Sequence, residues 1–278
     1  MRAGSTGRNV GGGPGPFGAA NPASRTASMR LCAEALWLAR KEIRWAWSSY
    51  VCSVSIVLCL GLVAAVSLSV GVSGFEAVVR EHGMEESYGA FFADYLFLLA
   101  CAVLGTNALL GYYTKNRRGI SVFGPTLPRR VPLSAGVIVG GHALGTLFVL
   151  VLGAFAFFVP VYFLSGLGEE LGMGAYLCFC AVWVGYALLG SGLSLFFGFG
   201  VSGRSYALIS YAFALPLMVL VVLLETTRYA GLVGRVALMA QGGHGALLAG
   251  LSVVMGGAAF LLLSRSTVRR LRLRDLPA

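Results

Sequence analysis

The sequence predicts an all-α integral membrane protein with six transmembrane helices, an in-plane amphipathic helix before the first of them, and both termini in the cytoplasm. Hydrophobic residues make up 57% of the 278 residues and charged residues only 12%, whereas soluble domains carry about 25% charged residues. Six apolar stretches are long enough to cross a bilayer, which needs about 20 residues each. Basic residues gather on one side of these stretches. The net charge of +10 therefore indicates membrane orientation rather than nucleic-acid binding.

The N-terminal region divides into two parts. Residues 1–28 are rich in Gly, Pro and Ser and cannot bury enough surface to offset their ordering entropy, so we expect a disordered tail. Met29 is an alternative start of the translated protein. Residues 29–49 predict an interfacial amphipathic helix, with an extension of the first span as the alternative. The predicted apolar arc of this helix comprises Cys32, Ala35, Leu36, Ala39, Ile43, Ala46 and Trp47.

Residues 50–264 form the predicted six-span domain. The third stretch is too long for one straight crossing, so we expect it to tilt or to begin as a cytoplasmic extension, with Pro160 loosening its far end. The first stretch is too long for a signal peptide and follows a basic segment, so we expect it to be retained. The six stretches are Tyr50–Val72, Phe92–Tyr113, Leu133–Phe163, Met173–Phe199, Tyr206–Leu224 and Ala246–Leu263.

The charge distribution orients these spans. With a cytoplasmic N-terminus, 18 of the 21 basic residues fall on the cytoplasmic side, and five of them lie in a basic tail at residues 265–278. Eight of the 11 acidic residues fall on the outer side. This distribution follows the positive-inside rule. It predicts a multi-pass protein of the plasma membrane with both ends in the cytoplasm.

The loop at residues 114–132, between the second and third spans, carries five basic residues and no acid. A topology anchor is the simpler interpretation, but it does not account for the prolines that bracket the second arginine pair or for the apolar residues between the charges. Proline fixes φ and biases the preceding residue toward extended geometry. We therefore predict a short folded element that contacts a partner. Its predicted coupling residues are Phe123, Leu127, Pro128, Arg129 and Arg130.

The sequence offers little catalytic or metal-binding chemistry. The six cysteines include no CxxC pair and the three histidines are scattered, so we expect no metal, disulfide, cofactor or catalytic site in this chain. One enzymatic alternative rests on Ser191 and His244, which are similar to the Ser–His dyad of the rhomboid intramembrane proteases. Ser191 lies about 27 Å from the outer end of the fourth span, whereas His244 lies at the outer end of the sixth span. Leu189 replaces that family's first glycine, so helix packing is the favoured interpretation of Ser191.

Asn107 and His142 are the deepest polar residues besides those with hydroxyl groups. We expect each to form an interhelical hydrogen bond, with a polar transport pathway as the alternative. Asp94 and Glu225 lie at outer ends of spans, where we expect solvated carboxylates, and this argues against a proton-coupled carrier. Small residues around His142 favour close packing; they are Gly136, Gly140, Gly141 and Gly145.

The layout over residues 29–270 and one short motif resemble the permeases of ABC-type exporters of the second class. In that family, the loop after the second span carries a coupling element that docks on the ATPase. The segment "TLPRRVPLSAGVIVGGHAL" is similar to this element: Leu127 and Pro128 match its leucine–proline pair, Arg130 its basic step, and residues 137–144 its apolar helix. The acidic turn that often precedes this element is basic in this chain.

The resemblance implies the permease subunit of an ATP-driven exporter, which forms the transmembrane route and couples to a separate cytosolic ATPase chain. ATP and Mg²⁺ would belong to that partner, because this chain has no GxxxxGK[ST] sequence to hold nucleotide phosphates. A second permease subunit, identical or different, is also implied, because two such halves enclose the route. A six-span scaffold or assembly protein without transport activity is the alternative.

Overall fold

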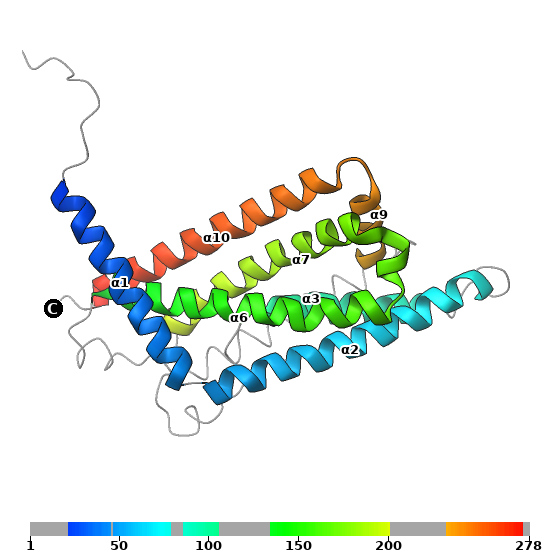
Figure 1. The fold of residues 1–278 in the computed structure, drawn as a ribbon, viewed down its shortest axis with the longest axis horizontal. Coiled ribbons are helices and arrows are strands. Elements are labelled where there is room, and N and C mark those ends of the chain that lie inside the picture. The colour runs from blue at the N-terminus through cyan, green and yellow to red at the C-terminus, as the bar shows by residue number, and fades with distance from the viewer. Residues whose placement is uncertain (1–21, 46, 79–85, 106–133, 201–231, 275–278) are drawn as a thin grey trace, which may run out of the picture.

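The computed structural model describes residues 22–45, 47–78, 86–105, 134–200 and 232–274, and the elements in these ranges are all α-helices (Figure 1). They are α1 (Pro22–Trp45), α2 (Trp47–Val78), α3 (Glu86–Val103), α6 (Ala135–Leu164), α7 (Leu167–Gly200), α9 (Leu232–Gln241) and α10 (Gly245–Arg274). Four helices, α2, α6, α7 and α10, contain segments long and apolar enough to cross a membrane. The described part of the chain is therefore an all-helical, membrane-embedded fold.

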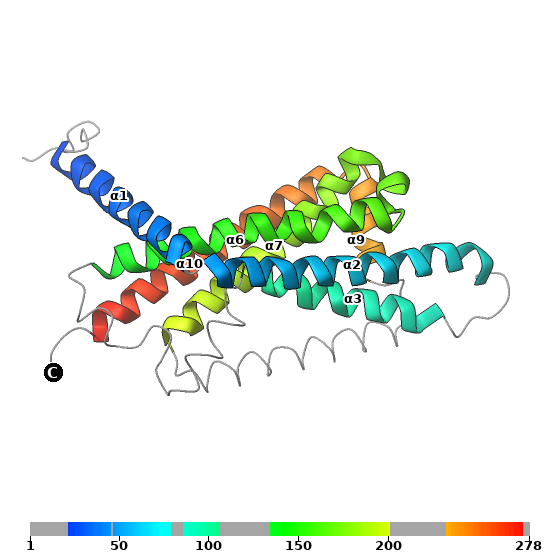
Figure 2. The same cartoon turned by 60° about the horizontal axis from the view of Figure 1, so that its bottom comes forward.

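The helices α2, α3, α6, α7 and α10 run alongside one another as a bundle (Figures 1 and 2). α1 leans across one end of the bundle and packs on α6, and the short α9 lies at the opposite end beside α7. We refer to these as the α1 end and the α9 end. The α1 end comprises α1, the start of α6 and the last turns of α7 and α10. The α9 end comprises α9 and the first turns of α7 and α10.

The first, third, fourth and sixth predicted spans are confirmed as long apolar helices. α7 breaks at Gly172, where φ is 70°, so its straight part begins at Met173, the predicted start of the fourth span. α3 covers only part of the second predicted span and ends at Val103. The fifth predicted span and the loop at 114–132 lie outside the described residues.

α1 is longer than the sequence predicts. It begins at Pro22, whereas the predicted amphipathic helix begins at Met29. Proline is favoured in the first turn of a helix, where its missing N–H costs no intrahelical hydrogen bond. The remainder of the predicted tail, residues 1–21, lies outside the described residues.

The structure of α6 accounts for the length of the third predicted span. The Ser134 side-chain oxygen accepts a hydrogen bond from the backbone N–H of Val137 at 3.3 Å, which is the geometry of a helix N-cap. The helix then continues through Pro160 to Leu164. Its 30 residues rise about 45 Å, against about 30 Å for the hydrocarbon core of a bilayer. About ten of its residues therefore exceed a perpendicular crossing.

Glycines bring the long helices into backbone contact. A Cβ atom on Gly61 of α2 would lie 2.8 Å from the Phe157 carbonyl oxygen of α6. Gly256 of α10 lies directly against the backbone of Gly185 of α7. Lipid chains are as apolar as the side chains, so close van der Waals contact of this kind drives much of the association of membrane helices.

Aromatic side chains fill the space between α3, α6 and α7. Phe97 of α3 is fully buried, and its ring centroid lies 5.0 Å from that of Phe157, 5.8 Å from that of Phe179 and 5.3 Å from that of Trp183. The rings meet at steep angles, and each such pair contributes about 0.5–1.5 kcal/mol beyond its burial. This cluster fixes α3 against α6 and α7.

A buried carboxylate joins α3 to α9. Asp94 is 5% exposed, and its two oxygens accept hydrogen bonds from the backbone N–H groups of Leu232 and Val233, the latter at 2.8 Å. These N–H groups lie in the first turn of α9, where no intrahelical acceptor exists. The prediction that Asp94 is solvated is therefore wrong, because its charge is satisfied by the N-terminus of another helix. Glu225 lies outside the described residues.

Candidate functional site at the α1 end

α1 docks on the first turns of α6 through small residues. Ala35 and Ala39 are buried in α1. A Cβ atom on Gly140 of α6 would lie 3.4 Å from the Cβ of Ala35, and one on Gly141 would lie 2.9 Å from Cδ2 of Leu38. Gly141 therefore leaves room for the Leu38 side chain, which would have to shift if Gly141 carried a Cβ, whereas the contact at Gly140 is an ordinary van der Waals contact.

The buried face of α1 differs from the predicted apolar arc. Cys32 and Leu36 belong to that arc but are exposed, Leu36 to 63%, and Trp47, which is 55% exposed, is the first residue of α2. The face that meets α6 is rotated toward Leu38 and Glu42, which are half-buried. The arc is predicted for a helix that lies in the membrane interface, so the exposure of these residues from the rest of the protein leaves it a prediction, while Ala35 and Ala39 of the same arc pack on α6.

One ion pair crosses this interface. Nδ1 of His142 on α6 lies 2.6 Å from Oε1 of Glu42 on α1, and the two side chains are 14% and 22% exposed. The other carboxylate oxygen, Oε2, is buried without a hydrogen-bond partner. The contact is an ion pair when the imidazole is protonated and a hydrogen bond from Nδ1–H to the carboxylate when it is neutral. Removing either group would leave the other poorly solvated, so the pair fastens α1 to α6.

His142 also connects α6 to the ends of α7 and α10. Its ring centroid lies 5.2 Å from that of Phe199 on α7. Phe199 belongs to a buried cluster that joins the three helices at the α1 end. The cluster consists of Ile138, Val139, Leu195, Phe199 and Leu271. The start of α6 is therefore tied to α1 on one side and to α7 and α10 on the other.

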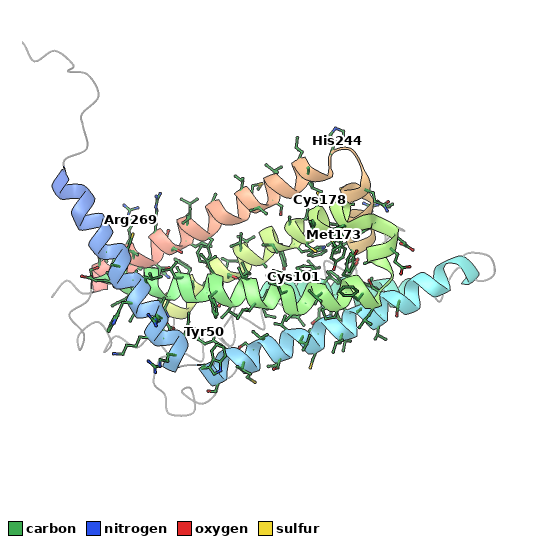
Figure 3. The ribbon with its side chains drawn as sticks, in the orientation of Figure 1. Tyr50, Cys101, Met173, Cys178, His244 and Arg269 are labelled. Atoms are coloured by element: carbon green, nitrogen blue, oxygen red, sulfur yellow. The ribbon has the colours of Figure 1, made fainter. Side chains whose placement is uncertain are left out.

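α2 reaches the same part of α6 through Tyr50, labelled in Figure 3. Tyr50 is 1% exposed, and a Cβ atom on Gly145 would lie 3.2 Å from its hydroxyl oxygen. The prediction that glycines around His142 serve close packing is therefore confirmed at Gly141 and Gly145, whereas a Cβ atom on Gly136 or Gly140 would make only an ordinary van der Waals contact.

His142 is the one predicted site residue in the part of the chain that the structure describes. Asn107 and the five predicted coupling residues (Phe123, Leu127, Pro128, Arg129 and Arg130) lie outside it.

Glu42 is a site residue that the sequence analysis misses. A signal for it exists: Ala35, Ala39 and Glu42 follow at spacings of four and three, which places one acid on a face of small residues.

The structure does not bring Ser191 and His244 together. The Ser191 hydroxyl is buried and donates to the Ala187 carbonyl oxygen of its own helix at 2.7 Å. His244 is exposed in the turn between α9 and α10, at the α9 end (Figure 3). Gly192, beside Ser191, packs against Phe260 of α10, which lies about 24 Å along that helix from His244. The two side chains cannot exchange a proton at this separation.

Within the described ranges, no group of three or more His, Cys, Asp or Glu residues could hold a metal ion. All six cysteines are free thiols. The start of α6 is thus a packed junction with α1, α2, α7 and α10.

Comparison with known proteins gives no match: no family model, no curated protein and no solved structure matches this chain. Its function is therefore inferred from its residues and their geometry.

Proposed function

We propose that this chain is the permease subunit of an ATP-driven exporter of ABC type, which lies in the plasma membrane with its α1 end in the cytoplasm. It forms the transmembrane route with a second permease subunit. A separate cytosolic ATPase subunit holds ATP and Mg²⁺ and supplies the energy. α2, α6, α7 and α10 provide four of the six proposed spans, and both termini lie on the cytoplasmic side.

The docking of α1 on the start of α6 is the observation that supports this proposal best. The loop at 114–132 leads almost directly into Ser134, the cap of α6, and the contact between Glu42 and His142 lies about 12 Å further along the helix. A displacement of the loop would therefore reach a helix end that is held by α1, α7 and α10. Coupling needs such a stiff connection, because a loosely packed helix end would absorb the displacement by local opening.

The charges at the two ends of the bundle give a second line of support. Exposed basic residues of α1 and α10 lie at the α1 end, and the exposed carboxylates of Glu169 and Glu170 lie at the α9 end. The positive-inside rule favours a cytoplasmic location for the end that carries the basic residues. The proposed coupling loop enters α6 at this same end.

The proposal is tested by purifying the tagged full-length protein from its native membrane in mild detergent and identifying the subunit that co-purifies. We expect a cytosolic ATPase subunit and ATP hydrolysis by the complex. The triple variant Arg129→Gln, Arg130→Gln and Phe123→Ala should reduce both the amount of co-purifying ATPase subunit and the rate of ATP hydrolysis. An exposed charge pair contributes under about 1 kcal/mol, whereas burying a phenylalanine contributes about 1.5–3 kcal/mol, so Phe123→Ala should have the larger effect.

The matched control carries Arg2→Gln and Arg8→Gln, which remove the same charge outside the loop. This variant should insert, co-purify and hydrolyse ATP as the wild type does. Absence of any nucleotide-hydrolysing subunit from the wild-type preparation would refute the proposal, and the scaffold alternative would take its place.

A further inference from the structure

The outward face of α10 is apolar over most of its length. Leu251 is 52% exposed, Val254 67% and Leu262 61%. These residues follow at spacings of three and eight, so they lie on one side of the helix, away from α7. An apolar face of this length, exposed on a helix long enough to cross a membrane, suits contact with lipid chains.

Three arginines continue this face toward the C-terminal end of α10. Arg265, Arg269 and Arg272 are exposed and follow at spacings of four and three, which places them on one side of the helix. Arg269 comes two turns after Leu262, so the basic residues and the apolar residues share the same side. Figure 3 shows Arg269 pointing away from the bundle.

Arg270 lies on a different side of α10 and has a partner within the protein. Its guanidinium carbon lies 4.6 Å from the centroid of the Phe196 ring on α7. By contrast, the ion pair found among the described residues involves none of the three outward arginines. Their charges are therefore available to a partner outside the described part of the chain.

The depth of these arginines matches that of phospholipid headgroups. The 20 residues from Gly245 to Ser264 rise about 30 Å, the thickness of the hydrocarbon core. The headgroup region adds about 5–7 Å on each side of the core, so Arg265 and Arg269 lie within it or at its edge, and Arg272 lies about 12 Å beyond Ser264, from where its long side chain can reach back. The change from leucine to arginine on one face thus marks the boundary between acyl chains and headgroups.

We propose that Arg265, Arg269 and Arg272 form a binding site for anionic phospholipid headgroups in the leaflet that surrounds the α1 end. The guanidinium group matches phosphate geometry with two parallel hydrogen bonds. The three side chains point sideways, on the same side as the lipid-facing residues, and this favours a lipid over an acidic protein. The site requires only that α10 is embedded in the membrane, so it stands independently of the proposed transport function.

The proposal is tested by native mass spectrometry of the full-length protein in mild detergent, titrated with phosphatidylglycerol or phosphatidylcholine. We expect phosphatidylglycerol to bind at least about tenfold more tightly, because each basic residue near an anionic surface contributes about fivefold in affinity. The variant R265Q/R269Q/R272Q should lose at least about tenfold in affinity for phosphatidylglycerol. Its affinity for phosphatidylcholine should be unchanged. The variant R265K/R269K/R272K should retain most of the affinity.

The matched control R2Q/R8Q/R25Q removes the same charge elsewhere and should bind phosphatidylglycerol as the wild type does. Millimolar inorganic phosphate should not displace the lipid, since free phosphate does not use the adjoining apolar face. Equal phosphatidylglycerol affinity of the glutamine variant and the wild type would overturn the proposal. Loss of a co-purifying protein with unchanged lipid binding would also overturn it and would assign the arginines to that protein. The thermal unfolding of the glutamine variant in phosphatidylcholine should match that of the wild type.

Discussion

A carboxylate and an imidazole meet between α1 and α6, where the surrounding contacts are made by alanine, glycine and leucine. Apolar helix faces in lipid can slide past one another at little cost, because no hydrophobic force distinguishes one position from the next. A directional hydrogen bond does distinguish them. Glu42 and His142 therefore set the position of α1 along α6, in the way that single buried polar groups fix register in other helical assemblies.

Glu42→Ala and His142→Ala should each lower the free energy of unfolding by about 1–3 kcal/mol, because each leaves a partly buried partner without its hydrogen bond. The double variant should lose less than the sum of the two, since the second change removes a group that has already lost its partner. Chemical unfolding in detergent, followed by tryptophan fluorescence, measures all four proteins of the cycle.

Glu34→Ala is the control for this cycle, because Glu34 is an exposed acid on the same helix. It should change the free energy of unfolding by less than about 0.5 kcal/mol. Strict additivity of Glu42→Ala and His142→Ala would contradict the fastening role of the pair.

At the scale of elements, α9 depends on a residue of another helix. Asp94 accepts from two N–H groups of the first turn of α9, and a helix of ten residues is too short to be stable by itself. Asp94→Ala should therefore speed amide hydrogen exchange at Leu232 and Val233 by about tenfold or more, since two charge-assisted hydrogen bonds are lost. Exchange monitored by mass spectrometry measures this. Glu169→Ala, which removes an exposed carboxylate at the same end, should leave exchange at these amides unchanged.

The crossing of α7 and α10 depends on the absence of a side chain at one position. Gly256 lies against the backbone of Gly185, whereas the adjacent Gly257 has open space beside its Cα. Gly256→Ala should lower the unfolding temperature and the yield of folded protein, because backbone atoms cannot move aside as a flexible side chain can. Gly257→Ala in the same helix should change neither measurably. Equal behaviour of the two variants in a thermal unfolding assay would contradict the packing of α7 against α10.

The positions of the long apolar helices, though not their full lengths, could be predicted from the sequence, because a bilayer demands runs of about 20 apolar residues and tolerates few charges within them. The fourth span is predicted to begin at Met173; the apolar helix begins at Leu167 and breaks at Gly172, which adopts a positive φ that other residues rarely adopt. The same reasoning predicted the packing role of the glycines beside His142. Glycine in a membrane helix often marks a close approach, as at Gly141 and Gly145, but Gly257 has open space beside it.

What could not be predicted depends on partners that are distant in the chain. The carboxylate of Asp94 looks solvated when only its own span is considered, but its donors lie 138 and 139 residues further on. The face that α1 buries is set by α6: Ala35 and Ala39 belong to the predicted arc, but the half-buried Leu38 and Glu42 lie outside it. Local periodicity identifies a helix, whereas the face that it buries depends on the surface opposite.

At the scale of the whole molecule, the two ends of the bundle differ in chemistry. The α1 end joins four helices through an ion pair and a buried apolar cluster, and basic residues cover the end of α10 there. The α9 end carries exposed acids and a short helix held by Asp94. We propose that the first end couples in the cytoplasm and that the second lies at the outer surface, and the function proposed for the loop at 114–132 depends on this orientation.

The most direct test is the accessibility of single cysteines, placed in a cysteine-free background, to an impermeant thiol reagent in intact cells. Glu169→Cys at the α9 end should be labelled. Arg269→Cys at the α1 end and Asn116→Cys in the proposed coupling loop should be labelled only after the membrane is permeabilised, because the account places both in the cytoplasm. Labelling of Arg269→Cys or Asn116→Cys in intact cells, with Glu169→Cys protected, would contradict it.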